Sequence, residues 1–240
     1  MNDRPLIIAM DVPDKAEADV LLASFGQRPL FLKVGMELFY KEGPALVEEW
    51  KAKGHRVFLD LKLHDIPNTV QRAAAQLARL QVDLVTVHAA GGSRMMAGTV
   101  EGLEQGTPAG QKRPSCIAVT QLTSTSETML NEELGIPLSM NEAVAAYAEI
   151  AERSGQDGVV CAAGEVPLIK SARSSSFITV TPGIRGAGEE AGDQARVVTP
   201  GTAADLGSDA IVVGRSITKA ADPAAAYEQM EQEWRMPNAE

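Results

Sequence analysis

The stretch Phe58-Leu59-Asp60-Leu61-Lys62-Leu63-His64-Asp65-Ile66-Pro67-Asn68-Thr69 begins as an apolar strand and then carries closely spaced charges. Side chains alternate between the two faces of a strand, so we expect Asp60 and Lys62 on one face and the leucines on the other. Pro67 suits the first turn of a helix, which places Asp65 where the strand ends. The plainer interpretation is a strand with one face in water, followed by Asp65 as a helix N-cap.

The same rhythm of strand and helix extends over the whole chain. We expect short apolar strands at residues 5–10, 30–34, 56–63, 83–88, 115–122, 158–162, 177–181 and 209–213. Helices are expected at 14–25, 37–53, 66–81, 93–105, in the segment before 154, and at 164–173, 194–206 and 223–234. Near-continuously apolar strands between helices are typical of a covered parallel sheet. Eight such units in 240 residues predict a single-domain (β/α)8 barrel over residues 1–240, with a doubly wound open sheet as the alternative.

Composition narrows the class of protein. The formal net charge of -10 and the pI near 4.9 argue against a partner such as nucleic acid or an anionic membrane surface. No apolar run is long enough to span a bilayer, and the N-terminus does not resemble a secretion signal. Cys116 and Cys161 lie in apolar strands, which indicates buried free thiols, and no Cys/His spacing suggests a metal site. We therefore expect a cytoplasmic protein without a metal.

Polar residues gather where the expected strands end, which is where the active sites of such barrels lie. A closed barrel has no wet edge strand, so charged side chains at its mouth must pair or act, and this favours a functional role for Asp60 and Lys62. The polar, glycine and proline positions at these ends are Asp11, Lys33, Asp60, Lys62, His88, Thr123, Ser124, Pro182, Arg185, Gly214 and Arg215.

Two loops indicate a phosphate site. Gly214-Arg215 follows the eighth strand at a new helix start, where backbone N–H groups favour an anion and a guanidinium matches phosphate oxygens. The loop at 181–194 contains four glycines and is long for its position, which is typical of a lid that brings Arg185 and Gln194 to a bound phosphate. The alternatives are a plain turn and a mobile surface loop.

These residues closely resemble the orotidine 5'-phosphate decarboxylase family, over nearly the whole chain. The resemblance rests on the segment 60–69, on Asp11, Lys33 and Thr123, and on 181–185 with Gln194 and Gly214-Arg215. It implies cofactor-independent conversion of orotidine 5'-phosphate to UMP and CO2 in pyrimidine biosynthesis.

The resemblance also implies a role for each site residue. The charged network at the reacting carbon would comprise Lys33, Asp60, Lys62 and Asp65. Asp65, Ile66 and Thr69 would come from the second subunit of a homodimer. Asp11, Lys33 and Thr69 would surround the ribose, and Thr123 and Ser124 would meet the pyrimidine. The phosphate and the lid would be held by Pro182, Arg185, Gln194, Gly214 and Arg215.

The chemistry available to these side chains agrees with that activity. Loss of CO2 from C6 of orotate leaves a carbanion that no carbonyl can delocalise, and the sequence has no cofactor motif that could supply an electron sink. A Lys62 ammonium group directed at C6 would stabilise the anion and then protonate it. Asp60 could stress the departing carboxylate or only position Lys62. His64 and His88 are expected to be structural, and His55 to be solvated.

Two other functions fit part of the pattern. A metal-dependent sugar-phosphate decarboxylase or aldolase could use the same spacing of acids and lysine around Mg2+. A nucleotide-phosphate binding module without catalytic activity would keep the phosphate site and show no turnover.

Overall fold

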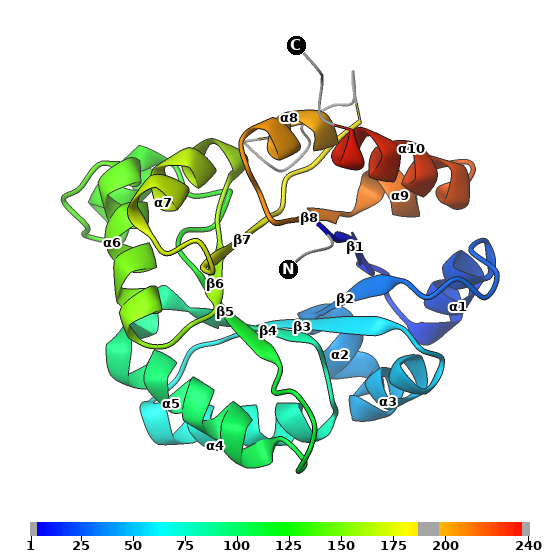
Figure 1. The fold of residues 1–240 in the computed structure, drawn as a ribbon, viewed down its shortest axis with the longest axis horizontal. Helices are drawn as coiled ribbons and strands as arrows, with labels where there is room; N and C mark the ends of the chain where they lie inside the picture. Colours follow the sequence, from blue (N-terminus) through cyan, green and yellow to red (C-terminus); the bar gives the residue numbers. More distant parts are fainter. Residues whose placement is uncertain (1–3, 187–196, 237–240) are drawn as a thin grey trace.

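The chain forms a closed parallel barrel surrounded by helices (Figure 1). The computed structural model describes residues 4–186 and 197–236. Neighbouring strands pair in sequence order, and the last returns to pair with the first. This closure confirms the (β/α)8 prediction and excludes the open sheet. The strands are β1 (Leu6–Ala9), β2 (Phe31–Gly35), β3 (Arg56–Leu63), β4 (Leu84–His88), β5 (Ser115–Val119), β6 (Gly158–Val160), β7 (Ile178–Thr181) and β8 (Ala210–Val213).

Some of the helices start at a side chain that caps them. Asp14, Ser139 and Asp222 each accept a hydrogen bond from the backbone N–H three residues later, which satisfies a donor that the helix itself cannot. The helices are α1 (Lys15–Ala23), α2 (Met36–Glu42), α3 (Pro44–Ala52), α4 (Pro67–Arg79), η1 (Ala89–Gly91), α5 (Gly92–Gly106), η2 (Met129–Glu133), α6 (Met140–Arg153), η3 (Ala163–Glu165), α7 (Val166–Ala172), α8 (Pro200–Asp205), α9 (Arg215–Thr218) and α10 (Pro223–Arg235). Among the described residues, no helix is long and apolar enough to cross a membrane.

Two of the expected helices were wrong in their extent. The helix expected at 37–53 is divided into α2 and α3, because Gly43 has a φ of 70° and Pro44 begins a new helix. The helix expected at 194–206 is α8 alone, because the Thr199 side chain caps it and Pro200 is its first residue. Residues 187–196 lie outside the described part of the chain.

The apolar side chains form two layers, as alternation along the strands requires. One layer fills the barrel and includes Ile7, Phe31, Phe58, Ile117 and Val212. The other lies between the strands and the surrounding helices and is larger. The filled interior forms a rigid base, so polar residues at the strand ends can be held in defined positions.

Close helix packing sets the position of α4, which begins directly after the charged segment. A Cβ added at Gly102 or Gly106 of α5 would lie 2.1 Å from the carbonyl oxygen of Gln71 or Ala75 of α4. Only glycine allows the two backbones to approach this closely. The segment 64–69 is therefore anchored at its C-terminal end by the contact between α4 and α5.

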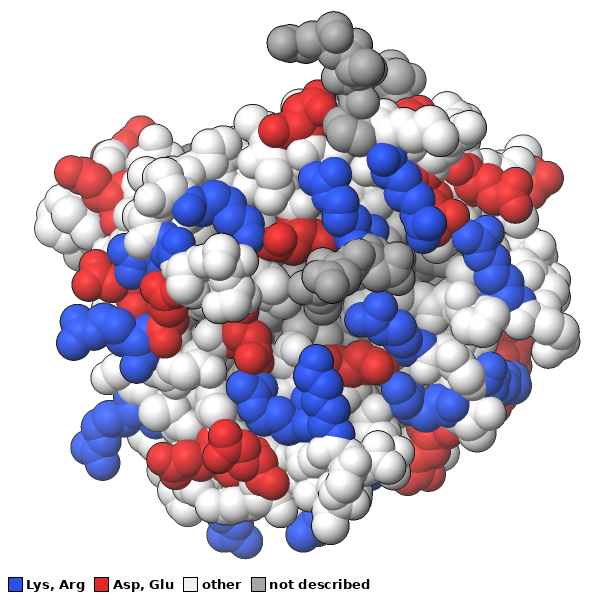
Figure 2. Space-filling view, in the orientation of Figure 1, with Lys and Arg blue, Asp and Glu red and all other residues white. Residues whose placement is uncertain are grey.

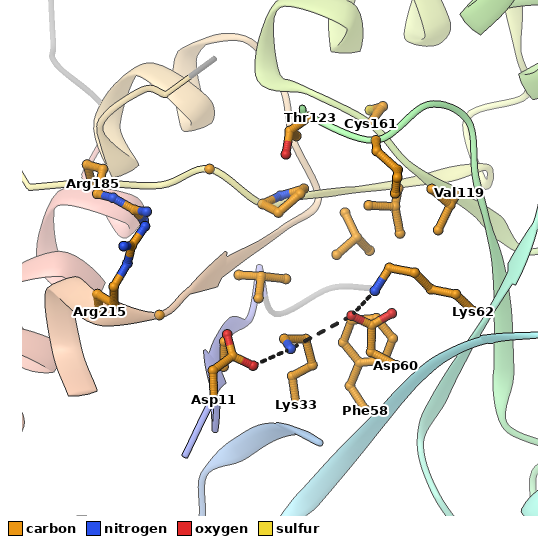
Figure 3. A pocket seen from close by; sticks show the side chains of 18 of the residues that line it. Asp11, Lys33, Phe58, Asp60, Lys62, Val119, Thr123, Cys161, Arg185 and Arg215 are labelled. Carbon is orange, nitrogen blue, oxygen red and sulfur yellow. Dashed lines mark hydrogen bonds and ion pairs between the residues drawn. The ribbon is translucent and has the colours of Figure 1, made fainter. Parts of the chain in front are cut away.

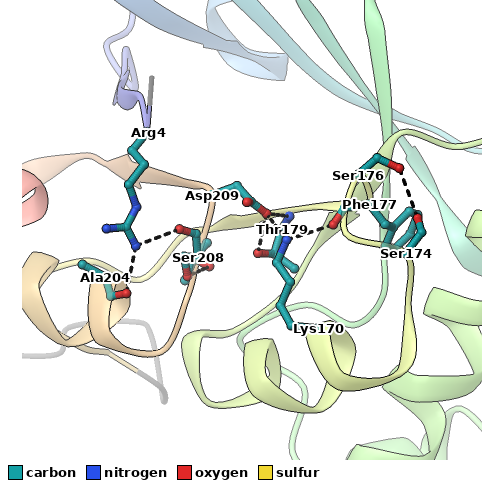
Figure 4. Close-up of polar contacts among 10 residues, drawn as sticks. Arg4, Lys170, Ser174, Ser176, Phe177, Thr179, Ala204, Ser208 and Asp209 are labelled. Carbon is teal, nitrogen blue, oxygen red and sulfur yellow. Dashed lines mark hydrogen bonds and ion pairs between the residues drawn. The ribbon is translucent and has the colours of Figure 1, made fainter. Parts of the chain in front are cut away.

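Three aspartates stabilise the end of the barrel at which the strands begin. Each lies directly before one of the strands β4, β6 and β8. Asp83, Asp157 and Asp209 each accept a hydrogen bond from the backbone N–H of the second residue of the preceding strand, and each pairs with a Lys or Arg side chain. Figure 4 shows the third of these clusters, in which Asp209 binds Lys170 and Thr179. On the face shown in Figure 2, acidic and basic side chains are interspersed.

Candidate active site

A cavity of about 460 Å³ opens at the C-terminal ends of the barrel strands (Figure 3). Most of the residues expected at these strand ends line it. They are Asp11, Lys33, Asp60, Lys62, Thr123, Pro182, Arg185, Gly214 and Arg215. Other lining residues were not anticipated as site residues, among them Gln121, Leu122, Cys161 and Lys219. Lys219 could have been noticed, because it lies one helical turn after Arg215.

Opposite charges alternate across three neighbouring strands at one side of this cavity. Lys33 Nζ lies 2.9 Å from Asp11 Oδ1 and 3.8 Å from Asp60 Oδ2, and Lys62 Nζ lies 2.8 Å from Asp60 Oδ2. Figure 3 shows this chain of contacts with Lys62 at its end. The Lys33 and Asp60 side chains are each 11% exposed, so water screens their interaction weakly. The site thus holds two ammonium groups in place with carboxylates.

The backbone at Lys62 departs from a regular strand. Leu59 pairs with Val85 and Leu63 with Val87, so β3 contains two more residues than β4 over this interval. Lys62 has a φ of 51°, a left-handed conformation that non-glycine residues rarely adopt. The prediction that Asp60 and Lys62 share one side is confirmed, but regular alternation is not its cause. A bulge aims the lysine at the cavity, as bulges often do beside active sites.

Thr86 holds this irregular geometry from the neighbouring strand. Its Oγ1 accepts a hydrogen bond from the Lys62 N–H at 2.9 Å and donates one to Asp60 Oδ1 at 2.8 Å. Thr86 is 1% exposed and is not among the described residues that line the cavity. The sequence offered little signal for it, because a threonine within an apolar strand is common.

Two arginines lie at the other end of the cavity. Arg185 is 8% exposed, and its Nη1 donates to the carbonyl oxygen of Ile184 at 2.9 Å. Arg215 is the first residue of α9, directly after Gly214. Figure 3 shows their guanidinium groups pointing toward one another, away from Lys62. This end of the cavity therefore presents positive charge to any anion that enters.

Several expected site residues lie on the surface of the chain and not in the cavity. Asp65, Ile66, Thr69 and Ser124 are exposed, and none of them is among the described residues that line the cavity. Asp65 Oδ1 accepts a hydrogen bond from the Ile66 N–H, and Ile66, not Asp65, is the N-cap of α4. The alternative role of Asp65 as an N-cap is therefore wrong. Gln194 lies outside the described residues.

The histidines are not among the described residues that line the cavity. The expectation that His55 is solvated needs correction. His55 is not simply solvated, because its Nδ1 accepts a hydrogen bond from the Leu30 N–H at 3.1 Å, and burial lowers the pKa of its imidazole. The His64 and His88 ring centres are 5.4 Å apart. Burial, together with electrostatic interactions with His64 and Lys62, lowers the pKa of His88.

Both cysteines are buried free thiols, as expected. Burial raises the pKa of the Cys116 thiol far above its ordinary value, which keeps this group neutral and unreactive. Within the described residues, no group of three or more His, Cys, Asp or Glu side chains is arranged to hold a metal ion.

Comparison with known proteins agrees with this geometry. A family model described as "Orotidine 5'-phosphate decarboxylase / HUMPS family" matches residues 4–230. A protein from Geobacillus sp. (strain WCH70) named orotidine 5'-phosphate decarboxylase is 60% identical over 235 residues, which is 98% of each chain. One of the same name from Bacillus caldolyticus is 60% identical over 230 residues, covering 96% of this chain and 94% of its own.

A solved structure leads to the same conclusion. The crystal structure of orotidine 5'-phosphate decarboxylase from Lactobacillus acidophilus superposes with a TM-score of 0.89 at 44% sequence identity, covering 98% of this chain and 100% of the other. The fold, the charged cavity and these similarities show that the chain belongs to the orotidine 5'-phosphate decarboxylase / HUMPS family.

Proposed function

We propose that this chain converts orotidine 5'-phosphate to UMP and CO2 without a cofactor, as a step of pyrimidine biosynthesis, with residues 1–240 acting as one (β/α)8 domain. The observation that carries the proposal is the 2.8 Å contact between Lys62 Nζ and Asp60 Oδ2 inside a cavity whose far end presents Arg185 and Arg215. The family match and relatives of the same name support it. The two buried free thiols are typical of a reducing compartment such as the cytoplasm.

The reaction needs a positive charge next to C6 of the pyrimidine ring. When the bond between C6 and the carboxyl carbon breaks, CO2 leaves and the electron pair stays on C6. The Lys62 ammonium group stabilises this pair electrostatically and then transfers one of its protons to C6, which forms UMP. The lysine recovers its proton from water after the product leaves. Lys33 lies on the other side of Asp60 and keeps the carboxylate paired throughout.

Asp60 acts mainly by positioning Lys62. Its Oδ2 faces the two ammonium groups, and its Oδ1 accepts the Thr86 hydroxyl. Such a carboxylate is fixed on both oxygens before substrate arrives, so it needs no rearrangement during the reaction. Stress on the departing carboxylate would add to this effect.

The remaining lining residues fit the rest of the nucleotide. Asp11 and Lys33, which pair with each other at 2.9 Å, are assigned to the ribose hydroxyls. Thr123 is assigned to the pyrimidine edge, with the exposed Ser124 beside it. The phosphate is assigned to Pro182, Arg185, Gly214 and Arg215, and also to Gln194, which lies outside the described residues. Contacts to the phosphate, remote from C6, supply binding energy for closing the site.

We also propose a homodimer in which Asp65, Ile66 and Thr69 complete the partner's site. Ile66 is 65% exposed, and Asp65 and Thr69 are also exposed. All three lie within six residues of the end of β3, the strand that carries Lys62. An exposed isoleucine beside two polar side chains suits an interface.

Mixing two inactive variants tests whether the site is shared. Lys62→Ala and Asp65→Ala are mixed in equal amounts and allowed to exchange subunits. The mixture should recover about a quarter of native activity, because half of the dimers contain one of each variant and therefore have one intact site of two. Recovery of no activity would contradict sharing of the site.

The direct test is the loss of orotidine 5'-phosphate absorbance with protein treated with a chelator and then freed of it. Turnover that survives this treatment and does not respond to added Mg2+ supports the proposal. Turnover that appears only with Mg2+ would indicate the metal-dependent chemistry instead. Binding of UMP without any turnover of orotidine 5'-phosphate would indicate a binding module.

A further inference from the structure

Thr86 lies at the junction of the two elements that the reaction requires. It occupies the middle of β4, beside the bulged part of β3, and its hydroxyl oxygen contacts both Asp60 and the Lys62 backbone. The side chain is buried and lies outside the described lining of the cavity. Any effect it has on the reaction must therefore pass through these two residues.

The direction of each hydrogen bond follows from the donors available. The Lys62 backbone N–H can only donate, so the Thr86 oxygen must accept that bond. The single hydroxyl proton of Thr86 then points to Asp60 Oδ1, which must accept it. This leaves Asp60 Oδ2 to face Lys62 Nζ at 2.8 Å and Lys33 Nζ at 3.8 Å. One hydroxyl group thus determines which carboxylate oxygen faces the lysines.

The same hydroxyl supports a strained backbone. Lys62 has a φ of 51°, a left-handed conformation that is sterically unfavourable for a residue with a side chain. The bulge also removes the Lys62 N–H from the regular ladder between β3 and β4, so that this donor needs another acceptor. The Thr86 oxygen is that acceptor, and it lies in a strand whose own position is held by pairing on both sides.

We propose that Thr86 is a positioning residue for the decarboxylation, acting through the orientation of Asp60 and the left-handed turn at Lys62. This inference rests on the proposed function of the same site. It predicts that the hydroxyl, and not the methyl group, matters for the chemical step. The phosphate end of the cavity lies elsewhere, so substrate binding should change little.

The chain offers a matched control in Thr179. It lies in β7, is 0% exposed, and donates its hydroxyl to the carboxylate of Asp209, which also binds Lys170 (Figure 4). The chemical groups are the same as at Thr86, but Asp209 and Lys170 are not among the described residues that line the cavity, whereas Asp60 and Lys62 are. Thr179→Ala therefore measures what the loss of such a hydroxyl does to the scaffold alone.

The test compares Thr86→Ser, Thr86→Ala, Thr86→Val and Thr179→Ala by steady-state kinetics with orotidine 5'-phosphate, after circular dichroism has established that each is folded. Ser and Ala differ only in the hydroxyl, so this pair remains informative if the Val variant does not fold. We expect Thr86→Ala to lower kcat by about a hundredfold with KM changed less than about threefold, because a misplaced lysine affects the transition state more than binding. Thr86→Ser should stay within about threefold of native kcat.

Each other outcome overturns the inference. Near-native kcat in Thr86→Ala would show that the hydroxyl is dispensable. Equal losses in the Ser and Ala variants would assign the effect to packing of the methyl group, and an equal loss in Thr179→Ala would assign it to the scaffold. If the native protein itself does not turn over orotidine 5'-phosphate, the proposed function fails, whereas turnover in the native protein with unaffected Thr86 variants refutes only the role of Thr86.

Discussion

Lys62 Nζ lies 2.8 Å from Asp60 Oδ2, two residues earlier on the same strand, while the Lys62 backbone has a φ of 51°. In a regular strand, residues two apart point the same way with their Cβ atoms well separated along the chain. The bulge changes this spacing and brings the ammonium group onto the carboxylate inside the cavity. Strain of this kind persists where the surrounding structure holds it, and it is often found at functional sites.

Replacing Lys62 with alanine should abolish turnover, with a loss of at least about a thousandfold in kcat, because the charge and the proton for C6 are both removed. Activity is measured by the decline of orotidine 5'-phosphate absorbance, and folding by circular dichroism. Lys51→Ala is the control, since Lys51 pairs with Asp83 at 2.6 Å at the opposite end of the barrel. Near-native turnover in Lys62→Ala would reject the role of Lys62.

Comparing glycine with alanine at position 62 separates backbone strain from chemistry. Lys62→Gly should be more stable than Lys62→Ala by about 1 kcal/mol, because glycine adopts a positive φ without steric penalty while alanine does not. Both variants should be inactive. Urea unfolding curves of the two proteins measure the difference, and an alanine variant as stable as the glycine variant would show that the backbone relaxes once the lysine is absent.

Arg215→Ala should weaken binding of phosphorylated ligands by about 10- to 100-fold, as expected for loss of a hydrogen bond between charged groups. Calorimetric titration with UMP and with uridine separates the phosphate contribution, since only UMP carries the charge. The result that would contradict the assignment is the same loss of affinity for both ligands.

His55 should make the fold sensitive to mild acid. Burial lowers the pKa of its imidazole in the folded state, so the unfolded chain, with a pKa near 6.5, takes up the proton first as the pH falls. The contribution of neutral His55 is complete above the unfolded pKa and is lost as the pH falls through that value toward the folded one. The protonated ring also cannot accept the Leu30 N–H on Nδ1.

The measurement is the free energy of unfolding at pH 7.5 and at pH 5.5 for the native protein and for His55→Gln. The native protein should lose more stability between these pH values than the variant does, since the titrations of all other groups are common to both. An identical pH dependence in the two proteins would mean that His55 does not titrate differently in the folded state.

Asp157→Ala should lower the free energy of unfolding by about 2–3 kcal/mol, because its carboxylate accepts hydrogen bonds from the Cys116 N–H and from both terminal nitrogens of Arg113. The kcat should stay close to native, since Asp157 is not among the described residues that line the cavity. Thermal or urea unfolding checks the first expectation and the absorbance assay the second. A large fall in kcat would show that this end of the barrel is coupled to the site.

The amino-acid sequence alone determined the barrel and most of the charged residues that line the cavity. The eight strands and the residues at their ends could be located because periodicity, caps and helix starts are local properties, and parallel closure places all strand ends at one rim. It also showed that Asp60 and Lys62 belong together. The break at Gly43 was missed, because an amphipathic pattern continues across it, while Gly43 ends one helix and Pro44 begins the next.

Only the tertiary structure decided how the site is held. The bulge at Lys62 depends on the register between β3 and β4, and register is a long-range property that no local pattern specifies. For the same reason the sequence did not single out Thr86, whose hydroxyl matters only because β4 places it between Asp60 and Lys62. The outward position of Ile66 likewise follows from how α4 packs on α5, since side-chain direction is set by the element's neighbours as well as by its sequence.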